Sequence, residues 1–145
     1  MKKITPFLWF DTQAEEAMNF YCSIFKNSKI LSVSPASVNF ELEGQEFIGF
    51  NAGPEFKFNE SISFFVDCED QAEVDYYWNA LTADGGEESM CGWLKDKYGL
   101  SWQIVPKQLG ELMGDSDPEK STRVREAMLK MHKIIVADLQ KAYNG

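Results

Sequence analysis

The chain has 145 residues, enough for one compact domain with its own core and too few for a cofactor domain joined to a separate substrate domain. Its 14 basic and 23 acidic residues give a formal net charge of −9, which makes nucleic acid and anionic membranes poor partners. Hydrophobic residues form 44% and aromatic residues 14% of the sequence, a composition that excludes a disordered chain.

The first half of the chain predicts one strand, one helix and three further strands. Residues 4–10 are apolar and rich in aromatics, which indicates a buried strand and is too short for a signal sequence or a membrane span. Asp11-Thr12 then resembles a helix N-cap, and apolar residues at three- and four-residue spacing predict a helix over residues 14–25. Three β-type runs follow, at residues 30–35, 37–42 and 47–50, with a hairpin turn at Glu43-Gly44-Gln45 between the last two.

The second half repeats this order of elements. An apolar strand over residues 62–66 precedes a helix over residues 72–81, and Gly85-Gly86 ends that helix. Two hairpin arms then flank residues 96–99, and the second arm covers residues 100–105. A duplicated strand-helix-strand-strand-strand order predicts an α+β fold in which two βαβββ modules pack together, with the helices on one face of the sheets.

Residues beyond Pro106 predict a helical tail. A short helical turn near residues 109–113 is followed by a helix that starts at Pro118, and an apolar stripe predicts that this helix is long, with about seven turns. The stripe either packs on its own domain or crosses to a second subunit in a symmetric homodimer. We therefore predict a single domain over residues 1–145, with module one at 1–53, module two at 60–106 and the tail at 108–145.

Four segments carry a resemblance to a known family. The most specific is residues 91–106, CGWLKDKYGLSWQIVP, and the others are residues 53–59, 70–75 and 126–131. Over essentially its whole length the chain resembles the PhnB-like family named 3-demethylubiquinone-9 3-methyltransferase. That family belongs to the vicinal-oxygen-chelate superfamily of glyoxalases, ring-cleaving dioxygenases and bleomycin-resistance proteins. The resemblance implies a glyoxalase-like fold, in which the two modules form one cupped mixed sheet, and a dimeric cup.

The resemblance also indicates where a metal ion would bind. In metal-dependent members of the superfamily, the first and last strands of each module supply His, Glu or Gln ligands inside the cup. The matching positions here are Thr5 or Pro6, Phe47 or Ile48, Ser61 or Ser63, and Gln103. One amide and a serine hydroxyl are too few good ligands for Zn²⁺, Ni²⁺ or Fe²⁺, so we predict no metal site.

No cofactor is predicted either. An S-adenosylmethionine site of the common kind needs a Gly-rich strand-to-helix turn, which the sequence lacks. The single histidine, His132, excludes a site built from several histidines. Three cysteines without a Cys-x-x-Cys pair favour a reducing compartment, so we predict a cytoplasmic protein. Cys91, near Lys95, is a weak candidate nucleophile.

Period-two alternation along the strands indicates which side chains line the cup. The predicted ligand-binding residues are an amide, serine hydroxyls and aromatic rings: Gln103, Ser101, Ser63, Ser61, Trp9, Phe7 and Phe65. Such a pocket suits a small aromatic or amphipathic ligand, held by stacking and by two or three hydrogen bonds. We therefore predict a metal-independent small-molecule-binding protein, a homodimer with no nucleic-acid or membrane partner, and assign no catalytic residue.

Other functions stay open, and so does the question of whether the protein is an enzyme. The family name implies a methyltransferase, and the superfamily includes metal-dependent lyases and dioxygenases. A metal-free enzyme would polarise a carbonyl or move a proton through Gln103, Ser63 and a carboxylate such as Asp11 or Asp67. Alternatively, the chain's own aromatic side chains fill the cup, and the protein only dimerises.

Overall fold

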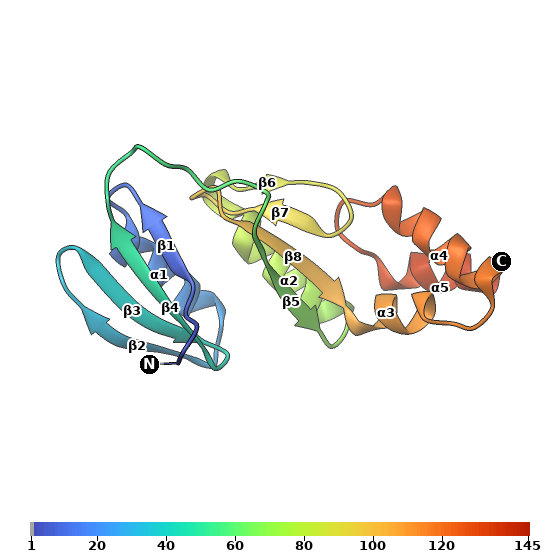
Figure 1. Cartoon of the computed structure of the whole chain (residues 1–145). Coiled ribbons are helices and arrows are strands. Elements are labelled where there is room, and N and C mark those ends of the chain that lie inside the picture. Colours follow the sequence, from blue (N-terminus) through green and yellow to red (C-terminus); the bar gives the residue numbers. More distant parts are fainter. Residues whose placement is uncertain (1) are drawn as a thin grey trace. The chain divides into compact units, whose positions relative to one another are not determined.

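The computed structural model describes residues 2–145, and the contacts within the chain divide it into two compact units. The first unit ends at Phe58, and the second spans Asn59–Gly145. Each unit contains a four-stranded mixed sheet with a helix packed on one face (Figure 1). The two predicted βαβββ modules are confirmed, one in each unit.

The first unit contains five elements. They are β1 (Phe7–Phe10), α1 (Ala14–Ile24), β2 (Ser28–Val33), β3 (Ser37–Leu42) and β4 (Gln45–Asn51). The strand order is β1-β4-β3-β2, in which β1 and β4 are parallel and the other pairs antiparallel. Glu43 and Gly44 both take positive φ angles, of 48° and 84°, which produce the predicted hairpin turn between β3 and β4.

The core of the first unit lies between its sheet and α1. Alternate strand residues, such as Leu8 and Phe40, are buried on the face that α1 covers. Gly49 of β4 lets the helix approach closely, because a Cβ there would lie 3.0 Å from the Val38 side chain and 3.5 Å from that of Ala14. The core of this unit thus lies on the one face of the sheet that α1 covers.

The start of α1 differs from the predicted N-cap at Asp11-Thr12. The helix begins at Ala14, and Gln13 before it makes no capping hydrogen bond through its side chain. Instead, Asn51 Oδ1 at the end of β4 accepts a hydrogen bond from the Ala14 N–H at 2.9 Å. A residue distant in sequence therefore satisfies a donor that a local cap would normally satisfy.

The second unit contains the repeated module and the tail. Its module elements are β5 (Ser63–Cys68), α2 (Gln71–Thr82), the short 3₁₀ helix η1 (Ala83–Gly85), β6 (Glu87–Glu88), β7 (Trp93–Lys95) and β8 (Ser101–Pro106). The strand order β5-β8-β7-β6 repeats that of the first unit, with β5 and β8 parallel. Asp70 caps α2 by accepting a hydrogen bond from the Glu73 N–H at 2.9 Å.

Asp96 organises the turn between β7 and β8. Its side chain is 2% exposed, and three donors converge on the carboxylate. Oδ1 accepts from the backbone N–H groups of Tyr98 (2.9 Å) and Leu100 (3.1 Å), and Oδ2 accepts from the Trp102 indole N–H (2.9 Å). The predicted turn at residues 96–99 is confirmed, and its aspartate is a buried hydrogen-bonding centre.

The tail contains three helices: α3 (Lys107–Met113), α4 (Pro118–Leu129) and α5 (Val136–Asn144). The prediction of one long helix after Asp117 is wrong, because residues 130–135 leave the helical path. There the backbone carbonyls of Met131 and His132 accept hydrogen bonds from the N–H groups of Cys91 (2.7 Å) and Gly92 (2.8 Å). These carbonyls accept hydrogen bonds from another segment in place of the backbone bonds that would continue the helix.

The apolar stripe of the tail packs on the chain's own second unit. Val124, Ile134 and Leu139 are fully buried in a cluster with Val105 of β8 and Leu109 of α3. The tail therefore has a small core that it shares with the last strand of the sheet. Of the helices within residues 2–145, none combines the length and the apolar character needed to cross a membrane.

Candidate functional site

The open face of the second sheet carries the amide and two aromatic rings in one row. The strand register places Gln103 of β8 between Phe65 of β5 and Trp93 of β7. Trp102 and Ile104, which flank Gln103 along β8, are buried on the opposite face. The alternation predicted for β8 is confirmed, and Gln103 lies on the face that α2 leaves uncovered.

Gln103 is hydrogen-bonded to Ser63 on the neighbouring strand. Its Nε2 donates to Ser63 Oγ at 2.9 Å. Across the described part of the chain this is the only hydrogen bond of the Gln103 side chain, so its Oε1 retains acceptor capacity. The Ser63 hydroxyl group, which accepts this bond, also retains its own donor. The pair can therefore orient a ligand that carries one hydroxyl or amine group.

A pocket of about 660 Å³ lies over this row of side chains. Phe65, Trp93 and Gln103 form its floor, and helices α3 and α4 contribute a wall. The remaining lining is mostly apolar, with Asp67, Lys107 and Glu111 as its charged residues. Binding pockets for small organic molecules typically have volumes of about 300–1,000 Å³, so this one is large enough for a ligand of one or two rings.

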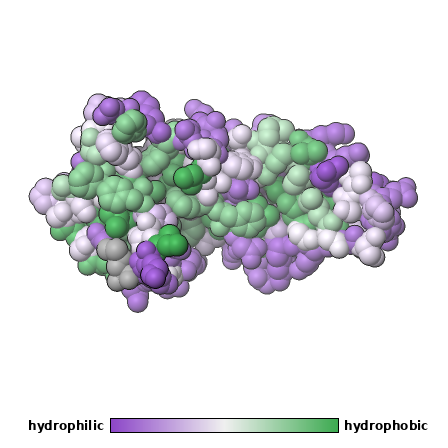
Figure 2. Space-filling view, in the orientation of Figure 1, coloured by the Kyte–Doolittle hydropathy of each residue, from purple (hydrophilic) through white to green (hydrophobic). Residues whose placement is uncertain are grey.

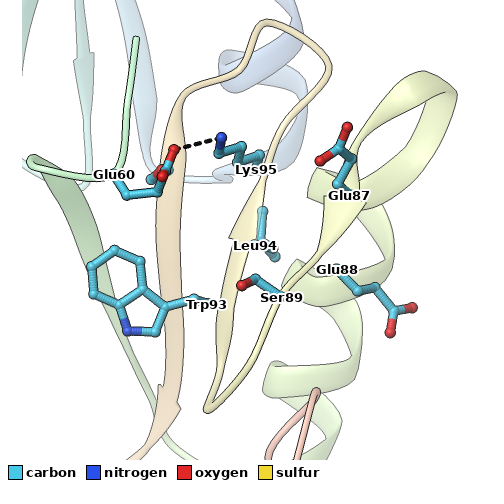
Figure 3. Close-up of a pocket in the computed structure, with 8 residues that line it drawn as sticks. Glu60, Glu87, Glu88, Ser89, Trp93, Leu94 and Lys95 are labelled. Carbon is cyan, nitrogen blue, oxygen red and sulfur yellow. Dashed lines mark ion pairs between the residues drawn. The ribbon is translucent and has the colours of Figure 1, made fainter.

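A smaller pocket of about 210 Å³ lies beside β6 and β7, and Trp93 lines both pockets. Figure 3 shows the Glu60 carboxylate meeting the Lys95 ammonium, and the ion pair measures 2.5 Å. The hydrogen bond between them lowers the pKa of Glu60 and raises the pKa of Lys95. Glu88 points away from this pair (Figure 3). The two charges are exposed, so the pair contributes little to stability.

None of the three predicted serines lines the larger pocket, and Ser63 is linked to it through its hydrogen bond with Gln103. Ser101 on β8 is 1% exposed, lines the smaller pocket, and has no hydrogen-bond partner for its hydroxyl oxygen among residues 2–145. Ser61 lies in the turn before β5, where its backbone N–H and its hydroxyl both donate to Asn59 Oδ1, at 2.9 Å and 2.6 Å. The structure therefore places Ser61 in a turn and Ser101 in a buried position beside the smaller pocket, and their binding role stays a prediction.

Phe7 and Trp9 lie on β1, on the open face of the first unit's sheet. The Phe7 side chain is 56% exposed, and its ring centre lies 5.6 Å from that of Phe50. The Trp9 indole packs edge-on against Phe56, with ring centres 4.9 Å apart. Figure 2 shows hydrophobic surface over the strands of this unit. That these two rings contact the same ligand as Gln103 stays a prediction.

The thiols and carboxylates set the chemistry that this region supports. The three cysteines are free, and burial raises the pKa of Cys68 to about 12 and also raises that of Cys22. Cys68 therefore stays protonated near neutral pH and is a poor nucleophile, whereas Cys91 lines the larger pocket. Within residues 2–145, no three side chains of His, Cys, Asp or Glu lie close enough together to hold a metal ion.

The sequence reasoning missed one whole side of the larger pocket. Leu109, Gly110 and Met113 of α3 and Met128 of α4 line it together with the sheet. The sequence offers one signal for them. Gly110 lies inside a predicted helical turn, although glycine has a low helix propensity. Their contribution depends on how the tail folds back onto β8, which no local pattern encodes.

Residues 2–105 match a family model described as 3-demethylubiquinone-9 3-methyltransferase. The chain belongs to this family. Within the 3-demethylubiquinone-9 3-methyltransferase family, it is similar to the PhnB protein from Bacillus cereus, with 37% sequence identity and a TM-score of 0.67. That match covers 72% of this chain and 99% of the Bacillus chain. The family resemblance seen in the sequence is confirmed over residues 2–105, whereas the segment at residues 126–131 lies outside the match.

More distant structures share the fold of this 3-demethylubiquinone-9 3-methyltransferase family member. A glyoxalase/bleomycin resistance protein from Albidiferax ferrireducens T118 has 13% identity and a TM-score of 0.52, over 70% of this chain and 95% of that one. Protein PA1353 from Pseudomonas aeruginosa has 18% identity and a TM-score of 0.58, and the match covers 73% of this chain and 98% of that one. The fold is thus glyoxalase-like, as predicted. Among curated proteins, no match to this chain was found.

Proposed function

We propose that this protein binds a small aromatic or amphipathic molecule and does so without a metal ion. The observation that carries the proposal is the pocket of about 660 Å³ over Gln103, with the rings of Phe65 and Trp93 on its floor. Aromatic side chains bind planar ligands by stacking, and one central amide orients them. A cytoplasmic location is part of this proposal, because all three cysteines are free.

The chemistry of the donor set supports binding without a metal ion. Gln103 and Ser63 occupy two of the positions at which metal-dependent relatives of the superfamily hold their ligands, and here they bond to each other. An amide and a neutral hydroxyl are weak ligands compared with the imidazole, thiolate and carboxylate groups that transition metals prefer. The pair is better suited to recognising the polar group of an organic molecule.

Replacing Gln103 with leucine tests this proposal. Leucine keeps the approximate size of the side chain and removes the amide, so the affinity for the neutral probe 2-naphthol should fall roughly tenfold. The measurement is a fluorescence titration, repeated in EDTA, which should leave the wild-type affinity unchanged. Gln140→Leu, at an exposed position of α5, is the matched control.

Two results of that titration would count against the proposal. If Gln103→Leu binds 2-naphthol as tightly as the wild type does, Gln103 does not belong to the site. If EDTA abolishes wild-type binding and added Zn²⁺ or Ni²⁺ restores it, the binding is metal-dependent.

A homodimer is the second part of the proposal. Edge strand β2 exposes Ile30, Leu31 and Val33 by about half, at 51%, 49% and 49%. An exposed apolar edge strand favours pairing with another chain, here a second copy. We expect sedimentation velocity to give twice the chain mass of 16.6 kDa. Val33→Lys should shift the protein toward the monomer, and a wild-type monomer at micromolar concentration would contradict the dimer.

A further inference from the structure

The C-terminal tail is attached to the second sheet at several points. In addition to the backbone hydrogen bonds from Cys91 and Gly92, Gln71 of α2 binds the segment that precedes α5. Its Nε2 donates to the Ile134 carbonyl at 3.1 Å, and its Oε1 accepts from the Val136 N–H at 2.7 Å. The tail is therefore a fixed part of the second unit, and it can form a wall of a binding site.

This wall is an addition to the family's common part. The family match ends at residue 105, whereas α3 begins at Lys107 and follows β8 directly. More than a quarter of the chain has no counterpart in the Bacillus structure, since that match covers 72% of this chain and 99% of that one. The helices that line the pocket thus distinguish this chain from the family model.

Gly110 is a position where the wall leaves room for a larger side chain. It lies within α3 and lines the pocket, and a Cβ added there would meet no atom within 4 Å. Glycine destabilises a helix interior by about 1 kcal/mol relative to alanine, so packing within the helix gives no reason for it. A larger side chain at Gly110 would therefore extend into open space at the edge of the pocket, which Phe65 and Trp93 also line.

The charges around the pocket favour a neutral ligand. Asp67 and Glu111 contribute two carboxylates, and the one ammonium group, that of Lys107, already pairs with the Glu69 carboxylate. An anionic ligand would therefore meet net negative charge in a protein whose overall charge is −9. The free acceptor capacity of Gln103 Oε1 further favours a ligand with a hydroxyl or amine donor.

We propose that α3 and α4 form a wall of the ligand site, and that Gly110 and Met128 set the size of the ring that this site admits. The ligand is a neutral aromatic compound that carries a hydroxyl or amine group. This inference rests on the proposed binding function and adds to it the ligand class and the specificity-determining residues. Gly110 provides space for a second ring, and Met128 supplies a polarisable thioether that packs against it.

Two variants and three probes test the inference by fluorescence titration and calorimetry. Gly110→Leu fills the space for a second ring, so its affinity for 2-naphthol should fall about tenfold while its affinity for phenol changes by less than about threefold. Met128→Ala removes a ring contact and should weaken 2-naphthol binding by about threefold or more. Naphthalene-2-sulfonate, the same ring with a negative charge, should bind the wild type about tenfold more weakly than 2-naphthol.

Two controls separate this inference from the binding function itself. Leu129→Ala, at a 53% exposed position beside Met128 on α4, should bind 2-naphthol as the wild type does. Gln103→Leu should lower the affinity for both phenol and 2-naphthol, because it removes the partner of their hydroxyl group and leaves the space for the ring unchanged. Circular dichroism shows which variants fold, and if Gly110→Leu does not, Met128→Ala decides the role of the wall.

Each negative outcome has a distinct meaning. If folded Gly110→Leu and Met128→Ala bind 2-naphthol like the wild type while Gln103→Leu does not, the tail plays no part in binding and the proposed function stands. If naphthalene-2-sulfonate binds as tightly as 2-naphthol, the assignment to neutral ligands is wrong. If the wild type binds neither 2-naphthol nor phenol, the inference and the proposed function both fail.

Discussion

Asp96→Ala is expected to destabilise the second unit by about 3 kcal/mol or more. The substitution leaves the Tyr98 and Leu100 N–H groups and the Trp102 indole N–H without the carboxylate that accepts from them. The hydrogen bonds of Leu100 and Trp102 are buried, so water does not replace them when they are lost. A thermal melt followed by circular dichroism should show the unfolding midpoint of this unit falling by roughly 10 °C or more.

Two further variants show whether the missing hydrogen-bond acceptor causes the loss of stability in Asp96→Ala. Asp96→Asn keeps the acceptor for the two backbone N–H groups but presents an NH₂ group to the Trp102 indole, so its melting point should lie between those of alanine and wild type. Glu126→Ala, at an exposed position of α4, should change stability by less than about 0.5 kcal/mol. An Asp96→Ala protein that melts with the wild type would exclude the carboxylate as the organiser of the turn.

Ile134→Ala is expected to destabilise the tail by about 2–4 kcal/mol, because it leaves a cavity in a fully buried position. The side chain packs between the small core of the tail and Gly92, where an added Cβ would lie 3.0 Å from Ile134 Cδ1. Loss of this contact weakens the backbone bonds that join residues 91–92 to residues 131–132. Hydrogen exchange should therefore accelerate at the Cys91 and Gly92 amides by more than tenfold.

The same chain offers a graded series and a matched control for this experiment. Ile134→Val removes one methyl group and should lower the free energy of unfolding by about 0.5–1.5 kcal/mol. Ile62→Ala removes the same atoms from a side chain that is 68% exposed, and exchange at Cys91 and Gly92 should not change. Unchanged exchange in Ile134→Ala would mean that the hydrogen bonds alone hold the tail in place.

The parts of the fold that depend on neighbouring residues were predictable from the sequence. The hairpin turn at Gly44 follows from a residue that tolerates positive φ, and the sheet faces follow from period-two alternation, which is strict in the burial of β3. The apolar spacing also predicted α2, which begins at Gln71, one residue earlier than that spacing indicated. In each case a local pattern and the tertiary structure favour the same conformation.

The parts that were missed depend on contacts between distant segments. The cap of α1 comes from Asn51, and the break between α4 and α5 comes from bonds to Cys91 and Gly92. The candidate site divides in the same way. Alternation indicates which face of its strand Gln103 or Phe65 occupies. Their neighbouring positions come from the pairing of β5 with β8, and the wall at Gly110 depends on the path of the tail after β8.

The pairing of first and last strands in each unit has a consequence for how the chain folds during synthesis. Strand β1 pairs in parallel with β4, and β5 pairs in parallel with β8, so neither sheet is complete until the last strand of its module has left the ribosome. Until then β1 and β5 lack their main partners, and such long-range parallel pairing is slow. The helices that follow β8 form from local contacts, but their apolar face needs the finished sheet. The order of synthesis therefore favours assembly of the first sheet, then the second sheet, and last the tail.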